Sequence, residues 1–115
     1  MKNIISLKKN SDFRRLYKQN SVARPTLVLY ARRNKASGSG VRLGITVSRK
    51  IGKANVRNRA KRRLREVFLA NQSHLAEGLD IVIVARFKTA EAPFGQLAHD
   101  FLKAAEELGI LKSAD

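Results

Sequence analysis

Apolar side chains recur at different spacings along this chain, and each spacing predicts a different element. Every second residue of 41–48 is apolar: Val41, Leu43, Ile45 and Val47. Such alternation predicts a strand with one buried face and one polar face. The apolar run 26–30 follows Pro25 and predicts a second strand, and the turn-forming residues 34–40 between the two runs suggest a hairpin. The uninterrupted apolar run 81–85 predicts a third strand, in the interior of the sheet.

Three other segments have the spacing of helices. The first has N-cap chemistry at residues 10–12 and then places three side chains on one side: Phe13, Leu16 and Tyr17. The second, about 55–71, has an apolar stripe roughly 120° wide: Val56, Ala60, Leu64, Val67 and Phe68. The last carries Phe94, Leu97, Ala98, Phe101, Leu102, Ala105 and Leu108 and ends at Gly109. The order helix, strands, helix, strand, helix predicts an α/β sandwich.

Length and composition fit one domain over residues 1–115, because a chain of 115 residues with 43% hydrophobic content has enough apolar surface for one core. The absence of cysteine excludes disulfides, cysteine metal sites and thiol catalysis. No apolar run is long enough for a secretion signal or a membrane span. We therefore expect a soluble, cytoplasmic protein.

The charge is strongly asymmetric along the chain. The net charge is +15, and residues 13–65 contain seventeen lysines and arginines without one acid. Residues 66–115 contain four basic residues against eight acids. A polycationic half points to a polyanionic partner, with nucleic acid first and an anionic membrane second.

The most basic stretch of the chain, residues 48–65, overlaps the first part of the second predicted helix and reads SRKIGKANVRNRAKRRLR. Cations near a helix N-terminus oppose the macrodipole by about 0.3–1 kcal/mol each, and like charges four residues apart repel by about 0.2–0.5 kcal/mol. A polyanion would reverse the sign of these effects, whereas a merely solvated face normally mixes both charges. Arginine forks and the Asn58 amide favour RNA over a membrane. The candidate RNA-binding residues are Arg49, Lys50, Lys53, Arg57, Asn58, Arg59, Lys61, Arg62 and Arg65.

These side chains divide between two directions around the helix. Asn58, Lys61 and Arg65 project away from the apolar stripe, and Arg59 and Arg62 lie further round, so the helix has two surfaces for two contacts. Aromatic residues beside cations form the usual platform for stacking single-stranded bases. The candidates are Phe13, Tyr17 and Tyr30, for which a place in the core is the alternative.

Around Arg57-Asn58-Arg59, the segment VSRKIGKANVRNRAKRRLREVF closely resembles the protein-subunit family of bacterial ribonuclease P. The resemblance spans nearly the whole chain: LKKNSDFRRLY is similar to that family's first helix, LVLYARRN and VRLGITVS to its strands, and DIVIVAR to its last strand. Lys53, Asn55 and Tyr17 differ from the residues commonest there.

The resemblance implies an α+β fold, a two-layer sandwich of about four strands and three helices. Its βαβ crossover through the basic helix would be left-handed, of the ribosomal-protein type, against the usual preference. It also implies a holoenzyme that removes the 5′ leader from precursor tRNA, in which a large RNA carries the catalytic centre with Mg²⁺. The polypeptide would bind that RNA one to one, with no catalytic residue, no metal of its own and no obligate protein partner.

The resemblance also implies roles for the candidate residues. The cleft for the single-stranded leader would consist of Phe13, Tyr17, Tyr30, Asn58, Lys61 and Arg65. The side chains that face the catalytic RNA would be Arg57, Arg59 and Arg62.

Two other functions remain open from the residues themselves. An autonomous nuclease needs a base, an acid or a metal cage, but His74 and His99 are distant in sequence and no metal-ligand spacing recurs. A ribosomal or general RNA-chaperone protein fits the charge equally well and would show no preference for a 5′ leader.

Overall fold

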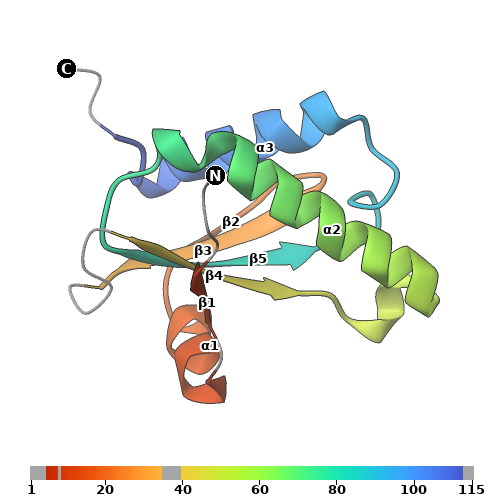
Figure 1. The fold of residues 1–115 in the computed structure, drawn as a ribbon, viewed down its shortest axis with the longest axis horizontal. Helices are drawn as coiled ribbons and strands as arrows, with labels where there is room; N and C mark the ends of the chain where they lie inside the picture. Colours follow the sequence, from red (N-terminus) through yellow and green to blue (C-terminus); the bar gives the residue numbers. More distant parts are fainter. Residues whose placement is uncertain (1–4, 8, 35–39, 113–115) are drawn as a thin grey trace.

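A computed structural model describes residues 5–7, 9–34 and 40–112 of the chain (Figure 1). Its centre is a five-stranded sheet in the order β1-β4-β5-β3-β2. The strands are β1 (Ile5–Ser6), β2 (Ser21–Ala23), β3 (Leu27–Arg33), β4 (Val41–Thr46) and β5 (Leu79–Ala85). The central strand β5 is parallel to β4 and antiparallel to β3, so the sheet is mixed.

Three helices cover the two faces of this sheet: α1 (Asn10–Tyr17), α2 (Ala54–Asn71) and α3 (Phe94–Leu108). Helices α2 and α3 lie on one face and α1 lies on the other (Figure 1). Short 3₁₀ turns flank α2, η2 at Arg49–Ile51 and η3 at Gln72–His74. The predicted helices and the α+β sandwich are confirmed. None of the helices in the described part of the chain is long and apolar enough to cross a bilayer.

The core is divided by the sheet into a large and a small part. Side chains of β5 alternate between them: Ile81 and Ile83 belong to the large cluster under α2 and α3, and Val82 belongs to a small cluster with Leu7 and Leu16 under α1. All three β5 residues are fully buried. The prediction that the run 81–85 is an interior strand is therefore confirmed.

The predicted hairpin between residues 26–30 and 41–48 is wrong. Strands β3 and β4 each pair with β5, which lies between them. Because β5 is apolar on both faces, it is best buried with a neighbour at each edge, and the two earlier strands supply those edges. The chain reaches this position through α2, so β4, α2 and β5 form a βαβ crossover; its left hand stays a prediction.

The structure also differs from the prediction at the start of α1, at Phe94 and in two short strands. Helix α1 begins at Asn10 after Lys9, without a side-chain cap hydrogen bond, so the N-cap predicted within residues 10–12 lies inside the helix. Phe94, expected on the buried face of α3, is 41% exposed because it opens the helix at the edge of the core. Strands β1 and β2 were not predicted, because their two and three residues are too short to show a period.

A buried carboxylate joins α3 to the strand pair β2–β3. Asp100 accepts hydrogen bonds from the backbone amide of Thr26 at 3.1 Å, the Thr26 hydroxyl at 2.7 Å and Nε of Arg24 at 3.2 Å. Burial acts to raise the pKa of Asp100, but the hydrogen bonds, led by those from Thr26, outweigh it and lower the pKa. The ionised form is therefore the one that fits this site.

Candidate nucleic-acid interface

A tight turn leads into the basic helix and places three cations just before it. The turn η2 ends at Gly52, whose φ of +147° lies in the region that favours glycine. A Cβ built there would also lie 3.3 Å from Cβ of Val56, in the first turns of α2. This close packing folds the segment against α2, with Arg49, Lys50 and Lys53 exposed beside the start of the helix.

The predicted RNA-binding residues of α2 lie at the surface with one partial exception. Five are exposed: Asn58, Arg59, Lys61, Arg62 and Arg65. Arg57 is half-buried, and its Nε is buried without a hydrogen-bond partner among the described residues. Arg62 forms an exposed ion pair with Glu66 at 3.6 Å, which is worth little because both side chains are hydrated.

Arg63 has a different role from its neighbours in the basic run. Its NH1 donates a hydrogen bond to the carbonyl oxygen of Ala90 at 2.8 Å, and its NH2 donates to the carbonyl oxygen of Ala92. The side chain therefore fixes the β5–α3 connection. This guanidinium is used within the protein, and it was not among the predicted site residues.

The three predicted aromatic residues form one cluster on the α1 face of the sheet. The rings of Phe13 and Tyr17 are 6.5 Å apart, and the rings of Tyr17 and Tyr30 meet edge to face at 5.1 Å. Tyr17 is 41% exposed and its hydroxyl lies 2.6 Å from Oγ1 of Thr46 on β4. Phe13 and Tyr30 are half-buried against the small core cluster. The aromatic residues therefore belong partly to the core and partly to an exposed surface on which a base could stack.

A small hollow of about 180 Å³ joins the aromatic cluster to the basic helix. Its lining includes Phe13 from α1 together with Lys61 and Arg65 from α2, although the two helices lie on opposite faces of the sheet. The other lining residues are Ser6, Leu7, Leu43, Gly44 and Ile45. The long basic side chains therefore meet the aromatic surface at the β4 side of the sheet. Asn58 does not line the hollow; it is exposed about one turn before Lys61.

Gly44 determines how closely α1 approaches the sheet. A Cβ at this position would lie 2.6 Å from Cε1 and 2.7 Å from Cζ of Phe13. The Phe13 ring thus lies directly over the glycine backbone. Gly44, Ser6, Leu7 and Thr46 were all missed as site residues, although a glycine inside a predicted strand is itself a signal of close approach.

An ionic cluster fixes α1 relative to the strands. The guanidinium of Arg42 donates two hydrogen bonds of 2.8 Å to the buried carboxylate of Asp80 and lies 3.8 Å from Asp12 of α1. The hydrogen bond with Asp80 raises the pKa of Arg42, which burial opposes, so its charge is retained. Asn34 and Arg32 also approach Asp80, at 2.7 and 3.5 Å.

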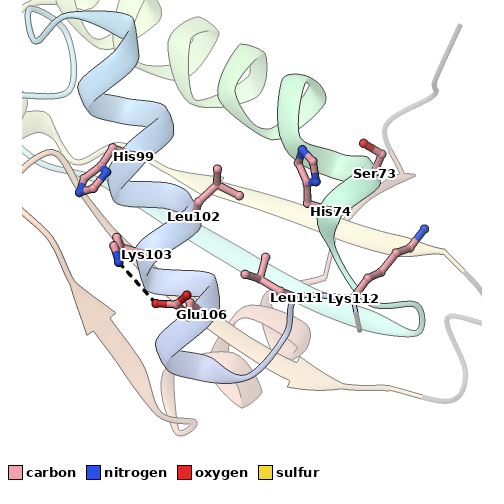
Figure 2. A pocket seen from close by; sticks show the side chains of 8 residues that line it. All are labelled: Ser73, His74, His99, Leu102, Lys103, Glu106, Leu111 and Lys112. Atoms are coloured by element: carbon pink, nitrogen blue, oxygen red, sulfur yellow. Dashed lines mark ion pairs between the residues drawn. The ribbon is translucent and has the colours of Figure 1, made fainter. Parts of the chain in front are cut away.

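The two histidines considered for an autonomous nuclease share a hollow of about 570 Å³ (Figure 2). His99 comes from α3 and His74 from η3, with Leu102 between them in the view. No hydrogen bond joins either histidine to a carboxylate within residues 5–7, 9–34 and 40–112, and Glu106 pairs with Lys103 at 3.6 Å. The same residues contain no group of three His, Cys, Asp or Glu placed to hold a metal ion.

These features place the chain among small, strongly basic α+β sandwich proteins. The ribonuclease P family model matches residues 1–109, and the chain belongs to the ribonuclease P protein family. It is 36% identical to the ribonuclease P protein component of Alkaliphilus oremlandii, over 99% of both chains.

Solved structures agree with this assignment. The chain is similar to the RNase P protein of Staphylococcus aureus with a TM-score of 0.80 and 34% identity, over 96% of this chain and 100% of that one. It is similar to the RNase P protein of Thermotoga maritima with a TM-score of 0.73 and 33% identity, over 85% of this chain and 92% of that one.

Proposed function

We propose that this chain acts as the protein subunit of ribonuclease P, which binds the large catalytic RNA and the 5′ leader of precursor tRNA and assists endonucleolytic removal of that leader. Membership of the ribonuclease P protein family supports the holoenzyme and its RNA partner. The observation that carries the leader contact is the hollow in which Phe13 lies beside Lys61 and Arg65.

The chemistry of this hollow suits a single strand. Stacking on an aromatic side chain requires an unpaired base, and the cations of Lys61 and Arg65 are suited to the phosphates that connect successive bases. Tyr17 and Tyr30 continue the aromatic surface from Phe13. Since any base has a face on which to stack, the site would accept leaders of many sequences. Asn58 would lie at the edge of this contact, where its amide can reach a sugar or a base.

The catalytic RNA would bind the other side of α2. Arg59 and Arg62 are exposed there, and Arg62 would exchange the weak ion pair with Glu66 for a phosphate. The resemblance assigns Arg57 to the same RNA, although it lies one turn before Lys61. Its Nε is buried without a hydrogen-bond partner among the described residues, which is consistent with a guanidinium that completes its hydrogen bonds on an RNA.

The hydrolytic chemistry is proposed to belong to the RNA. Among the described residues, no three His, Cys, Asp or Glu lie together in a position to hold a metal ion. Mg²⁺ bound by the RNA would supply the activated water and the charge stabilisation. The polypeptide would position the leader and neutralise phosphates.

The test is cleavage of a precursor tRNA at low Mg²⁺ by the protein, by a bacterial ribonuclease P RNA, and by both together. Efficient cleavage at the mature 5′ end only by the combination supports the proposal. Cleavage by the purified protein alone would make it a nuclease, and a protein that adds nothing to a competent RNA would be a general RNA-binding protein.

The two surfaces are then separated by mutation. Arg59→Ala with Arg62→Ala should weaken assembly with the ribonuclease P RNA more than it weakens the preference for precursor over mature tRNA. Phe13→Ala should do the opposite. Equal effects of both variants on both measurements would refute the division between the two sides of α2.

A further inference from the structure

The connection between β5 and α3 displays an aromatic side chain that the proposed sites do not use. Phe87 is 72% exposed, the highest value among the large hydrophobic residues described. It stands between Arg86 and Lys88, which are both exposed. An isolated exposed apolar residue needs no explanation, but an aromatic ring between two cations is the arrangement that binds single-stranded nucleic acid.

The exposure of Phe87 does not come from a poorly held loop. The fully buried Thr89 accepts a hydrogen bond from the backbone amide of Arg86 at 2.8 Å and donates one to the carbonyl oxygen of Thr26 at 2.5 Å. Arg63 of α2 binds the carbonyl oxygens of Ala90 and Ala92. The backbone on the C-terminal side of Phe87 is thus tied to the residue before β3 and to α2. The segment that carries the ring therefore has little backbone freedom to lose on binding.

A hollow of about 700 Å³ lies beside the ring. Its apolar lining includes Phe87, Pro25 and Pro93, and its polar lining includes Lys88, Glu91 and Gln96. This volume is in the range of sites for small organic groups. Flat apolar side chains with a few hydrogen-bonding groups at the rim suit a nucleobase, which has two apolar faces and a polar edge.

The charges around the ring favour an anionic chain. Neither Arg86 nor Lys88 forms an ion pair with a carboxylate in the part of the chain that the structure describes. Glu91 is the single acid among the residues that line the hollow. The net charge of +15 acts in the same direction, since it draws polyanions and repels a second copy of the chain.

The position of Phe87 decides which RNA it would contact. The β5–α3 connection lies on the side of the sheet that carries α2 and α3, away from α1 and the aromatic cluster (Figure 1). Arg63 ties this connection to α2, and the exposed Arg59 is about one turn earlier on the same side of that helix. The connection that carries the ring is therefore held by the helix proposed to bind the catalytic RNA, on the opposite face of the sheet from α1 and the aromatic cluster (Figure 1).

We propose that Phe87 stacks on an unpaired base of the large RNA subunit, with Arg86 and Lys88 on the adjoining phosphates. The inference rests on the proposed function and adds to it a second anchoring point for the RNA, outside the basic helix. Loss of one stack weakens nucleic-acid binding by about 5- to 150-fold.

The experiment measures the affinity of a ribonuclease P RNA transcript for the wild-type protein and for Phe87→Ala, Phe87→Leu and Phe87→Trp. Phe94→Ala is the matched control, because Phe94 is also partly exposed but lies between Pro93 and Gly95 instead of between cations. The chain contains no tryptophan, so fluorescence of the Phe87→Trp protein reports on this position alone.

We expect Phe87→Ala and Phe87→Leu to weaken RNA binding about 5-fold or more, with melting temperatures close to that of the wild type. Phe87→Trp should keep the affinity and lose fluorescence when RNA is added, Phe94→Ala should bind as the wild type does, and the preference for precursor over mature tRNA should be unchanged in all of them.

Several results would overturn the inference. Unchanged affinity of Phe87→Ala would exclude a stack, and full affinity of Phe87→Leu would leave only an apolar contact. Tryptophan fluorescence that changes with protein concentration in the absence of RNA would assign the ring to a second copy of the chain. Failure of the wild-type protein to bind the RNA would instead reject the proposed function, and this inference with it.

Discussion

Replacing Gly44 with alanine tests how the leader site is built. The added Cβ would lie 2.6 and 2.7 Å from two atoms of the Phe13 ring and 3.2 Å from Cδ1 of Leu7. Carbon atoms prefer separations of about 3.5–4.0 Å, so the ring must move by roughly 1 Å. We therefore expect Phe13 to leave its place over β4.

The size of the effect on stability follows from two opposing contributions. Forcing a methyl group into a packed site costs about 1–3 kcal/mol, and replacing glycine by alanine restricts the unfolded chain and returns about 0.4–1 kcal/mol. The free energy of unfolding of Gly44→Ala should therefore fall by about 1.3 kcal/mol, within limits of about 0 and 2.6 kcal/mol. The affinity for precursor tRNA should fall towards that for mature tRNA, because the displaced ring no longer lines the hollow.

The assay combines urea unfolding, followed by circular dichroism, with binding of labelled precursor and mature tRNA. Gly95→Ala is the control, since a Cβ at this position of α3 meets no atom within 4 Å and alanine is the better helix former. Its stability should stay the same or rise by up to about 1 kcal/mol, with tRNA binding unchanged.

A double-mutant cycle provides the decisive comparison. In a Phe13→Ala background the clash is absent, and Gly44→Ala should then be neutral or slightly stabilising. The same loss of stability in both backgrounds would show that Phe13 is not the group displaced, and the account of Gly44 would be refuted.

Two further predictions concern salt and pH. The affinity for ribonuclease P RNA should fall with a log–log salt slope of about −0.7 to −0.9 per phosphate, for about five to eight contacts, and a slope near zero would exclude electrostatic binding. Because the pKa of Asp100 is lowered in the folded protein, its ionised form stabilises the fold above the unfolded pKa of about 3.9, and this stabilisation is lost as the pH falls through the folded value. Asp100→Asn should lower the free energy of unfolding at pH 7 by about 1–3 kcal/mol and reduce its loss on acidification; an unchanged acid dependence of unfolding would exclude Asp100 as a source.

The predictable parts of the fold are those encoded locally. Helix α2 was expected over about 55–71 and occupies Ala54–Asn71, because the apolar stripe from Val56 to Phe68, more than three turns long, is visible in the sequence alone. Helix α3 ends at Leu108, and the following Gly109 adopts the left-handed backbone conformation. The glycine at this position had predicted the end of the helix. The order of the strands was not predictable from periodicity, because alternation identifies a strand and its buried face but not its neighbour.

The same distinction applies to the candidate site. Resemblance to a family supplied the grouping of Phe13 with Lys61 and Arg65, which arise from different helices and meet only across the edge of the sheet. The angular positions of the arginines around α2 would also have predicted which of them are partly buried. Arg63 is seven residues after Val56 and therefore on the apolar side, and Arg57 is seven residues before Leu64, which agrees with its partial burial.

Under the proposed function, the arrangement of α2 would explain why one rigid helix serves two RNA contacts better than two loops would. Ala60, Leu64, Val67 and Phe68 are fully buried, so packing holds the helix in place despite the repulsion among its cations. Its 18 residues span about 27 Å. Under the proposed function, Lys61 and Arg65 on one side and Arg59 and Arg62 on the other then have a fixed separation and direction. An RNA bound on the second side would be held in register with a leader bound on the first, and that register would be set by the hydrophobic core of the protein.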